Sequence, residues 1–109
     1  MQITTRQVLD VTVADLEGRL DSHAAGQTYD ELVRLAGSTK KLLLNLDKLE
    51  FLSSAGLRSL LVAAKLLKSS GGMLRMCGAH GVVHETLVVS GFNSLLNLHD
   101  DENEAVRSF

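Results

Sequence analysis

The middle of the chain joins a buried strand to an apolar-faced helix, and this pair constrains the fold more than any other feature. Residues 42–46 form a nearly continuous apolar run, which is typical of a strand covered on both faces. After a short loop, the strongest helical period in the chain follows, at Leu57, Leu60, Leu61, Ala64 and Leu67. A strand that leads into a helix in this way favours an α/β domain.

The flanking segments continue the alternation of strands and helices. We expect further strands over residues 2–7, 11–18, 73–77 and 95–98, and further helices over residues 22–36, 82–89 and 100–108. The N-cap of the first helix is expected at Asp21 or Ser22 and its end at Gly37, and a bulge is expected near Asp15. The order ββαβαβαβα predicts one α/β domain over residues 1–109, with a mostly parallel central sheet, an N-terminal antiparallel edge strand and helices packed against it.

Charge and composition argue against several classes of protein. The 109 residues carry a net charge of −2 without any run of lysine or arginine, so we expect no nucleic-acid partner. The one cysteine, Cys77, excludes an internal disulfide. The sequence has neither a leader pattern nor an apolar run of the roughly 20 residues that a membrane span needs. We therefore expect a cytoplasmic protein with no membrane span.

The candidates for catalysis or metal binding are weak. Cys77 precedes a loop without the arginine that a cysteine phosphatase needs, so we interpret it as a buried structural residue. His80 and His84 have the i, i+4 spacing of a metal pair, but no cysteine or carboxylate cluster completes a ligand set. The glycines lack the lysine–serine ending of a P-loop. We expect a binding module rather than an enzyme, with no cofactor and no metal.

Two serines stand where the loop after residue 46 becomes the central helix. One of Ser53 and Ser54 is expected to be the N-cap. The free amides and the dipole of a helix N-terminus also stabilise a phosphate. The small neighbours Ala55 and Gly56 leave the Ser54 hydroxyl accessible. Ser54 is therefore a candidate phosphate acceptor, whose added charge would disturb docking of a partner.

Residues 45–57, Asn-Leu-Asp-Lys-Leu-Glu-Phe-Leu-Ser-Ser-Ala-Gly-Leu, resemble the signature of the STAS domain of bacterial anti-sigma factor antagonists. Three further segments match other parts of that family's pattern. They are Gly18-Arg19-Leu20-Asp21 before the first helix, Gly71-Gly72 before a strand, and Val89-Ser90-Gly91-Phe92 after the third helix. The resemblance covers nearly the whole chain, and the order of the elements agrees with it.

This resemblance implies a role in partner switching. The unphosphorylated antagonist binds an anti-sigma factor, which is a serine kinase with an ATP-binding fold, and so releases a sigma factor. The kinase phosphorylates the position of Ser54, and a serine phosphatase reverses the step. The family often has aspartate at the position of Ser53. We expect one partner-binding face formed by Asp21, Ser22, Ser53, Ser54, Gly56 and Arg58.

Other functions are compatible with the same fold. STAS domains also occur as small regulatory subunits of lipid-transport ABC systems, and a ligand-binding sensor is a further alternative. They occur as domains attached to anion transporters too, but the sequence has no membrane segment, so we do not expect that form. Genomic neighbours separate the first of these from sigma control. A neighbouring kinase gene indicates sigma control, and an ABC operon indicates lipid transport.

Overall fold

The computed structural model describes residues 1–91 and 96–109, which form five strands and four helices in the order ββαβαβαβα. This order is the one predicted from the sequence. The strands are β1 (Gln2–Val8), β2 (Val11–Leu20), β3 (Lys41–Leu52), β4 (Met73–Cys77) and β5 (Leu98–His99). The helices are α1 (Ala25–Ser38), α2 (Ser54–Ser69), α3 (Gly81–Val89) and α4 (Glu102–Arg107).

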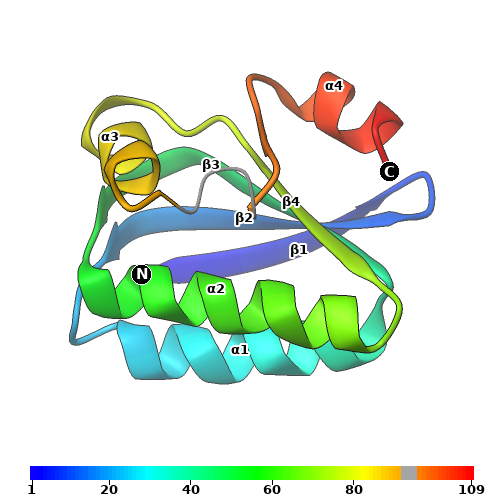
Figure 1. Ribbon diagram of the computed structural model, residues 1–109, viewed down its shortest axis with the longest axis horizontal. Coiled ribbons are helices and arrows are strands. Elements are labelled where there is room, and N and C mark those ends of the chain that lie inside the picture. The colour runs from blue at the N-terminus through cyan, green and yellow to red at the C-terminus, as the bar shows by residue number, and fades with distance from the viewer. Residues whose placement is uncertain (92–95) are drawn as a thin grey trace.

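The five strands form one sheet in the order β1-β2-β3-β4-β5 (Figure 1). β1 is antiparallel to β2, and the other pairs are parallel, as the predicted fold class requires. The parallel strands follow one another across the sheet in sequence order, and the connections between parallel strands are right-handed. The connecting helices α1, α2 and α3 therefore lie on one side of the sheet. α1 and α2 run next to each other along this side, and α4 lies on the opposite side.

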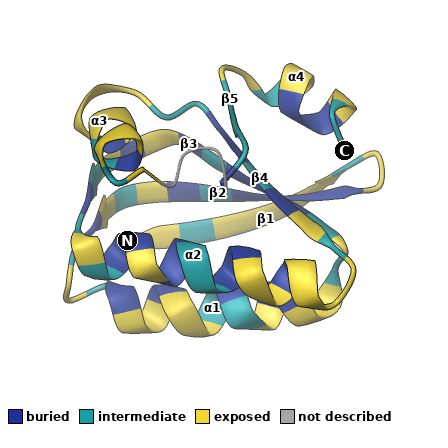
Figure 2. Ribbon diagram, viewed as in Figure 1, coloured by how far each residue is buried: buried dark blue, intermediate teal, exposed yellow. Residues whose placement is uncertain are grey.

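The side chains of β3 alternate between two apolar clusters. Figure 2 shows that β2 is mostly buried, whereas β1 beside it is mostly exposed. Leu42, Leu44 and Leu46 belong to the large cluster formed with α1, α2 and α3. Leu43 points the other way, into a smaller cluster that includes Val13, Cys77 and residues of α4. This arrangement confirms that the run at residues 42–46 is a strand covered on both faces.

β3 is longer than the sequence analysis predicted. The segment over residues 47–52, expected to be a loop, continues the strand and pairs with β2 up to Leu20 opposite Leu52. The inward leucines Leu46, Leu49 and Leu52 lie three residues apart, which does not match the period of two in a regular strand. Two register shifts between β2 and β3, one of them directly after Asp15, absorb the difference. An irregularity therefore lies at Asp15 as predicted, but the extra residue belongs to β3, because Asn45–Lys48 advances three residues opposite two in Asp15–Glu17.

Other element boundaries also differ from the predictions, most of them by one or two residues. The cap position of α1 is Ala24, not Asp21 or Ser22, and the helix continues through Gly37 to Ser38. Gly37 does not adopt the left-handed conformation with which glycine often ends a helix, and it remains within α1. The strand expected over residues 95–98 is Leu98–His99, and Leu95 lies outside the described residues.

Candidate phosphorylation and partner-binding site

The start of α2 is fixed to the end of β2 by backbone hydrogen bonds. The Ser53 amide donates to the Leu20 carbonyl at 2.9 Å, and the Ser53 carbonyl accepts from the Leu57 amide at 2.8 Å. Ser53 is the N-cap, because its extended backbone precedes the helix and its Oγ accepts from the Gly56 amide at 3.0 Å. The expectation that one of the two serines caps the helix is confirmed, and the capping residue is Ser53.

Gly56 lies beneath the surface, in contrast to the rest of the predicted partner-binding set. A Cβ at this position would stand 2.6 Å from Leu20 Cγ and 2.8 Å from the Leu20 carbonyl oxygen. Glycine is therefore required by close packing of α2 against the end of β2. Gly56 can position its neighbours, but its burial leaves it little surface to offer a partner.

Ser54 occupies the first position of α2, with its side chain exposed. The hydroxyl has no hydrogen-bond partner among the described residues, whereas the Ser53 hydroxyl is engaged in the cap. No acidic residue stands in the first turn of α2. Free amides at this turn and the helix dipole therefore act on the Ser54 side chain, and no carboxylate within the turn itself opposes them.

Ser54 also lines a groove of about 470 Å³ between α2 and α3. The other lining residues include Leu57, Val82 and Val89, and the two valines are 48% and 79% exposed. Glu85 is the charged residue of this groove. A group attached to Ser54 would therefore stand at the rim of a largely apolar depression.

Asp21 and Ser22 lie in the turn between β2 and α1, next to the residue whose carbonyl holds Ser53. Asp21 Oδ1 accepts a hydrogen bond from the Ala24 amide at 2.9 Å, so the carboxylate supports the turn that leads into α1. This bond lowers the pKa of Asp21, with smaller contributions from His23 and Arg19. Asp21 is therefore a fixed negative charge at neutral pH, and Ser22 is exposed.

Arg58 is exposed one helical turn after Ser54 and lines a second groove, of about 380 Å³, between α1 and α2. Tyr29, Asp30 and Val62 line the same groove. The structure thus gathers Asp21, Ser22, Ser53 and Ser54 where the end of β2 meets the start of α2, and places Arg58 one turn further along.

The groove residues on α3 were not identified from the sequence. Val83 and Leu87 are buried as predicted, but Val88, which was considered a further inward residue, is 44% exposed. A nine-residue helix with valine at positions 82, 83, 88 and 89 carries more apolar residues than one buried side can hold. That excess is the signal that would have pointed to an exposed apolar surface on α3.

Cys77 and His80, the alternative chemical candidates from the sequence, both have structural surroundings. Cys77 is buried, and burial raises the pKa of its thiol to about 12, so the structural interpretation of this cysteine is confirmed. His80 stands at the cap position of α3, and its Nε2 lies 2.7 Å from the Asp47 carbonyl oxygen. Within residues 1–91 and 96–109, no group of three or more metal-ligating side chains is present.

None of the helices in the described part of the chain is both long enough and apolar enough to cross a membrane.

Comparison with known proteins identifies the family to which this fold belongs. The family model described as STAS domain matches residues 2–105. BtrV of Bordetella bronchiseptica, which has the name of an anti-sigma factor antagonist, is 31% identical over 110 residues, covering 100% of this chain and 95% of BtrV. The Val89–Phe92 segment quoted for the resemblance ends at Phe92, outside the described residues.

Two solved structures share the fold. An anti-sigma factor antagonist from Mycobacterium paratuberculosis has a TM-score of 0.89 at 18% identity, covering 98% of this chain and 92% of that one. The Bacillus cell fate determinant SpoIIAA in its phosphorylated form has a TM-score of 0.74 at 20% identity, covering 98% and 97%. With a family match over nearly its whole length, the chain belongs to the STAS family of anti-sigma factor antagonists.

Proposed function

We propose that this protein, when unphosphorylated, binds an anti-sigma factor through the surface around Ser54 and thereby frees a sigma factor. The anti-sigma factor is a serine kinase with an ATP-binding fold, and its phosphorylation of Ser54 ends the binding. A serine phosphatase restores the binding-competent form. This function places the protein in the cytoplasm, where the sigma factor and ATP are found.

One observation carries the choice of Ser54, namely that its hydroxyl is exposed and unengaged at the first turn of α2. Ser53 is the competing acceptor, but its Oγ is committed to the Gly56 amide. A kinase that removed Ser53 from this bond would uncap α2, at a cost of about 1 kcal/mol. The existence of a phosphorylated form of the structurally similar SpoIIAA supports a phosphate switch in this fold.

The chemistry of transfer belongs to the partner. ATP, magnesium and the catalytic base are supplied by the kinase, and this chain contributes a positioned hydroxyl as the nucleophile. The attacking Ser54 Oγ forms the bond to the γ-phosphorus, ADP leaves, and the hydroxyl proton passes to the base of the kinase. No enzymatic activity of this chain itself is part of the proposal.

The phosphate would act on binding through charge and desolvation. It adds about −1.5 to −2 charges at neutral pH, close to the ionised Asp21 turn and at the rim of the groove lined by Leu57, Val82 and Glu85. A partner that covers this groove must desolvate the dianion and face its charge. A loss of about 3 kcal/mol in binding free energy weakens the complex more than a hundredfold.

The test combines phosphorylation and binding with a purified anti-sigma kinase and ATP. We expect intact-mass analysis to find one phosphate on the wild-type chain, site mapping to place it on Ser54, and the phosphorylated chain to lose kinase binding. Ser54→Ala should accept no phosphate and still bind. Ser53→Ala is the matched control, because it removes the adjacent hydroxyl while Ser54 should still be modified.

Two other outcomes have defined meanings. Binding of the wild-type chain without any phosphate would retain the antagonist role and reject the switch at Ser54. Neither binding nor phosphate with any kinase of this class would overturn the proposed function and favour a regulatory subunit of a lipid-transport ABC system.

A further inference from the structure

β1 is an edge strand whose outer side is unpaired. It lies at one end of the sheet and pairs with β2 over seven consecutive residues, from Gln2 opposite Glu17 to Val8 opposite Val11 (Figure 1). No other strand of the described residues pairs with it. The free edge therefore presents a row of backbone donors and acceptors over the full length of β1.

This edge lacks the features that usually prevent two sheets from pairing. β1 has the sequence Gln-Ile-Thr-Thr-Arg-Gln-Val, without proline, glycine or lysine, and it is rich in β-branched residues. The pairing of β1 with β2 has no register shift, because both shifts of the sheet lie between β2 and β3. A regular seven-residue edge of this kind is a template for another strand.

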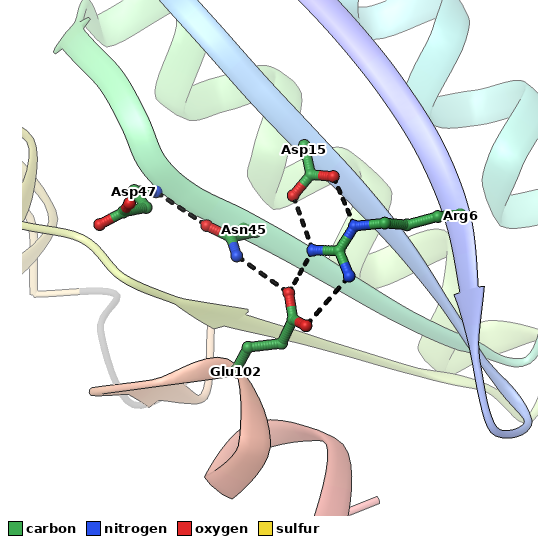
Figure 3. A network of polar contacts seen from close by, with 5 residues as sticks. All are labelled: Arg6, Asp15, Asn45, Asp47 and Glu102. Atoms are coloured by element: carbon green, nitrogen blue, oxygen red, sulfur yellow. Dashed lines mark hydrogen bonds and ion pairs between the residues drawn. The ribbon is translucent and has the colours of Figure 1, made fainter.

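Arg6 is the one charged residue of β1, and its guanidinium is held away from the edge. It contacts Asp15 at 2.7 and 3.0 Å and also both carboxylate oxygens of Glu102 (Figure 3). The side chain extends over the sheet towards α4, where Asn45 also binds Glu102. The positive charge is neutralised by Asp15 and Glu102 on the α4 side of the sheet, so it does not repel a strand that approaches the edge.

A groove of about 460 Å³ lies beside the edge, between Ile3 and α1. Its wall on α1 has acidic Asp30 and Glu31 followed by basic Arg34. Glu31 and Arg34 already form an ion pair within the helix, with side chains 34% and 63% exposed. An acid-then-base order along one helix is complementary to a second copy of the same helix that runs in the opposite direction.

We propose that β1 pairs with β1 of a second copy of this chain, antiparallel, so that two sheets join into one across a two-fold axis. Arg34 then approaches the acidic residues on α1 of the other copy, and the reverse contact follows by symmetry. This charge complementarity is the reason for choosing a second copy over an unrelated peptide. The interface is small, so the dimer is a weak one.

The hairpin predicts the register of this pairing. Val8 and Val11 flank a two-residue turn, and residues in these positions of a hairpin form a hydrogen-bonded pair. Hydrogen-bonded pairs alternate along an antiparallel ladder, so the backbone N–H and C=O groups of Arg6 and Thr4 also point towards β2. The backbone groups of Ile3, Thr5 and Gln7 then point outwards. The register with most bonds sets Thr5 against Thr5 of the partner subunit and Ile3 against Gln7 of the partner subunit.

The inference does not depend on the proposed function. The dimer uses β1 and the 30–34 segment of α1, and none of the candidate-site residues 21–22, 53–54, 56 and 58 belongs to these elements. Asp30 lines both the groove beside β1 and the groove of Arg58, so the two surfaces adjoin there. A dimer would therefore carry two Ser54 sites, and its bivalency would strengthen binding to a partner that is itself dimeric.

The test is sedimentation equilibrium of the full chain up to about 1 mM, with Thr5→Pro as the main variant. Proline at Thr5 removes an outward amide that β2 does not use, so the monomer should fold while the dimer is lost. We expect a concentration-dependent dimer for the wild type and at least a tenfold weaker one for Thr5→Pro with an unchanged circular dichroism spectrum.

Three further variants keep the test decisive if Thr5→Pro does not fold. Thr5→Lys places two ammonium groups opposite each other across the two-fold axis and should weaken the dimer. The double exchange Glu31→Arg/Arg34→Glu preserves the complementary order and should retain it, whereas Arg34→Glu alone should weaken it. A wild type that stays monomeric at the highest concentration, or a dimer unaffected by Thr5→Lys, would overturn the proposal.

Discussion

Replacement of Gly56 by alanine gives a sharp test of how α2 is seated. In an exposed helix interior this change stabilises a protein by up to about 1 kcal/mol. At Gly56 the new Cβ would stand 2.8 Å from the Leu20 carbonyl oxygen and 2.6 Å from Leu20 Cγ. That carbonyl cannot move easily, because it accepts the Ser53 amide at 2.9 Å.

The expected effect of Gly56→Ala is therefore a loss of stability. Overpacking costs about 1–3 kcal/mol, and the rigid carbonyl favours the upper part of that range. After subtraction of the helix-propensity gain, we expect the free energy of unfolding to fall by about 2 kcal/mol, or roughly 8–16 °C in melting temperature.

Urea denaturation followed by circular dichroism measures this effect, since a domain of this size usually unfolds in two states. Gly37→Ala is the matched control, because Gly37 also lies in a helix and an added Cβ there meets none of the described atoms within 4 Å. It should raise stability by up to about 1 kcal/mol. A Gly56→Ala protein as stable as the wild type would refute the steric argument.

Three further predictions follow from the described contacts. Ser53→Ala removes the N-cap of α2 and should lower stability by about 1 kcal/mol, whereas Ser53→Asp should retain it, as thermal melting would show. The Glu102→Gln variant should lose stability at neutral pH, because hydrogen bonds from Arg6 lower the pKa of Glu102. This contribution is present above the ordinary value of 4.5 and is lost as the pH falls through the lowered pKa, so the stabilities of the two proteins should converge in acid. Native Cys77 should resist iodoacetamide at pH 8 and react after unfolding, since its pKa is raised to about 12.

Much of the fold could be predicted from local patterns, because the helical period of α2 and the apolar run of β3 each report burial directly. The second half of β3 could not. There the inward leucines are spaced by three, and only pairing with β2 through two register shifts makes that spacing compatible with a strand. Register shifts depend on a neighbouring strand that is distant in sequence, so a local pattern does not contain them.

The candidate site shows the same division. Ser53 and Ser54 stood out as capping residues because capping is a local property, and the assignment of the cap to Ser53 required the observed bond to Gly56. The burial of Gly56 follows from contact with Leu20, which lies 36 positions earlier in the sequence. The groove with α3 was missed for a similar reason, since exposure of Val82 and Val89 depends on how α3 packs.

The ion pair between Arg6 and Glu102 joins residues 96 positions apart and has a consequence for synthesis of the chain. α4 is the element that covers Val11, Val13 and Leu43 on its side of the sheet. A ribosome releases that helix after all five strands, so these apolar side chains remain open to water for most of translation. The nascent sheet therefore passes through a stage at which it could associate with other chains or a chaperone.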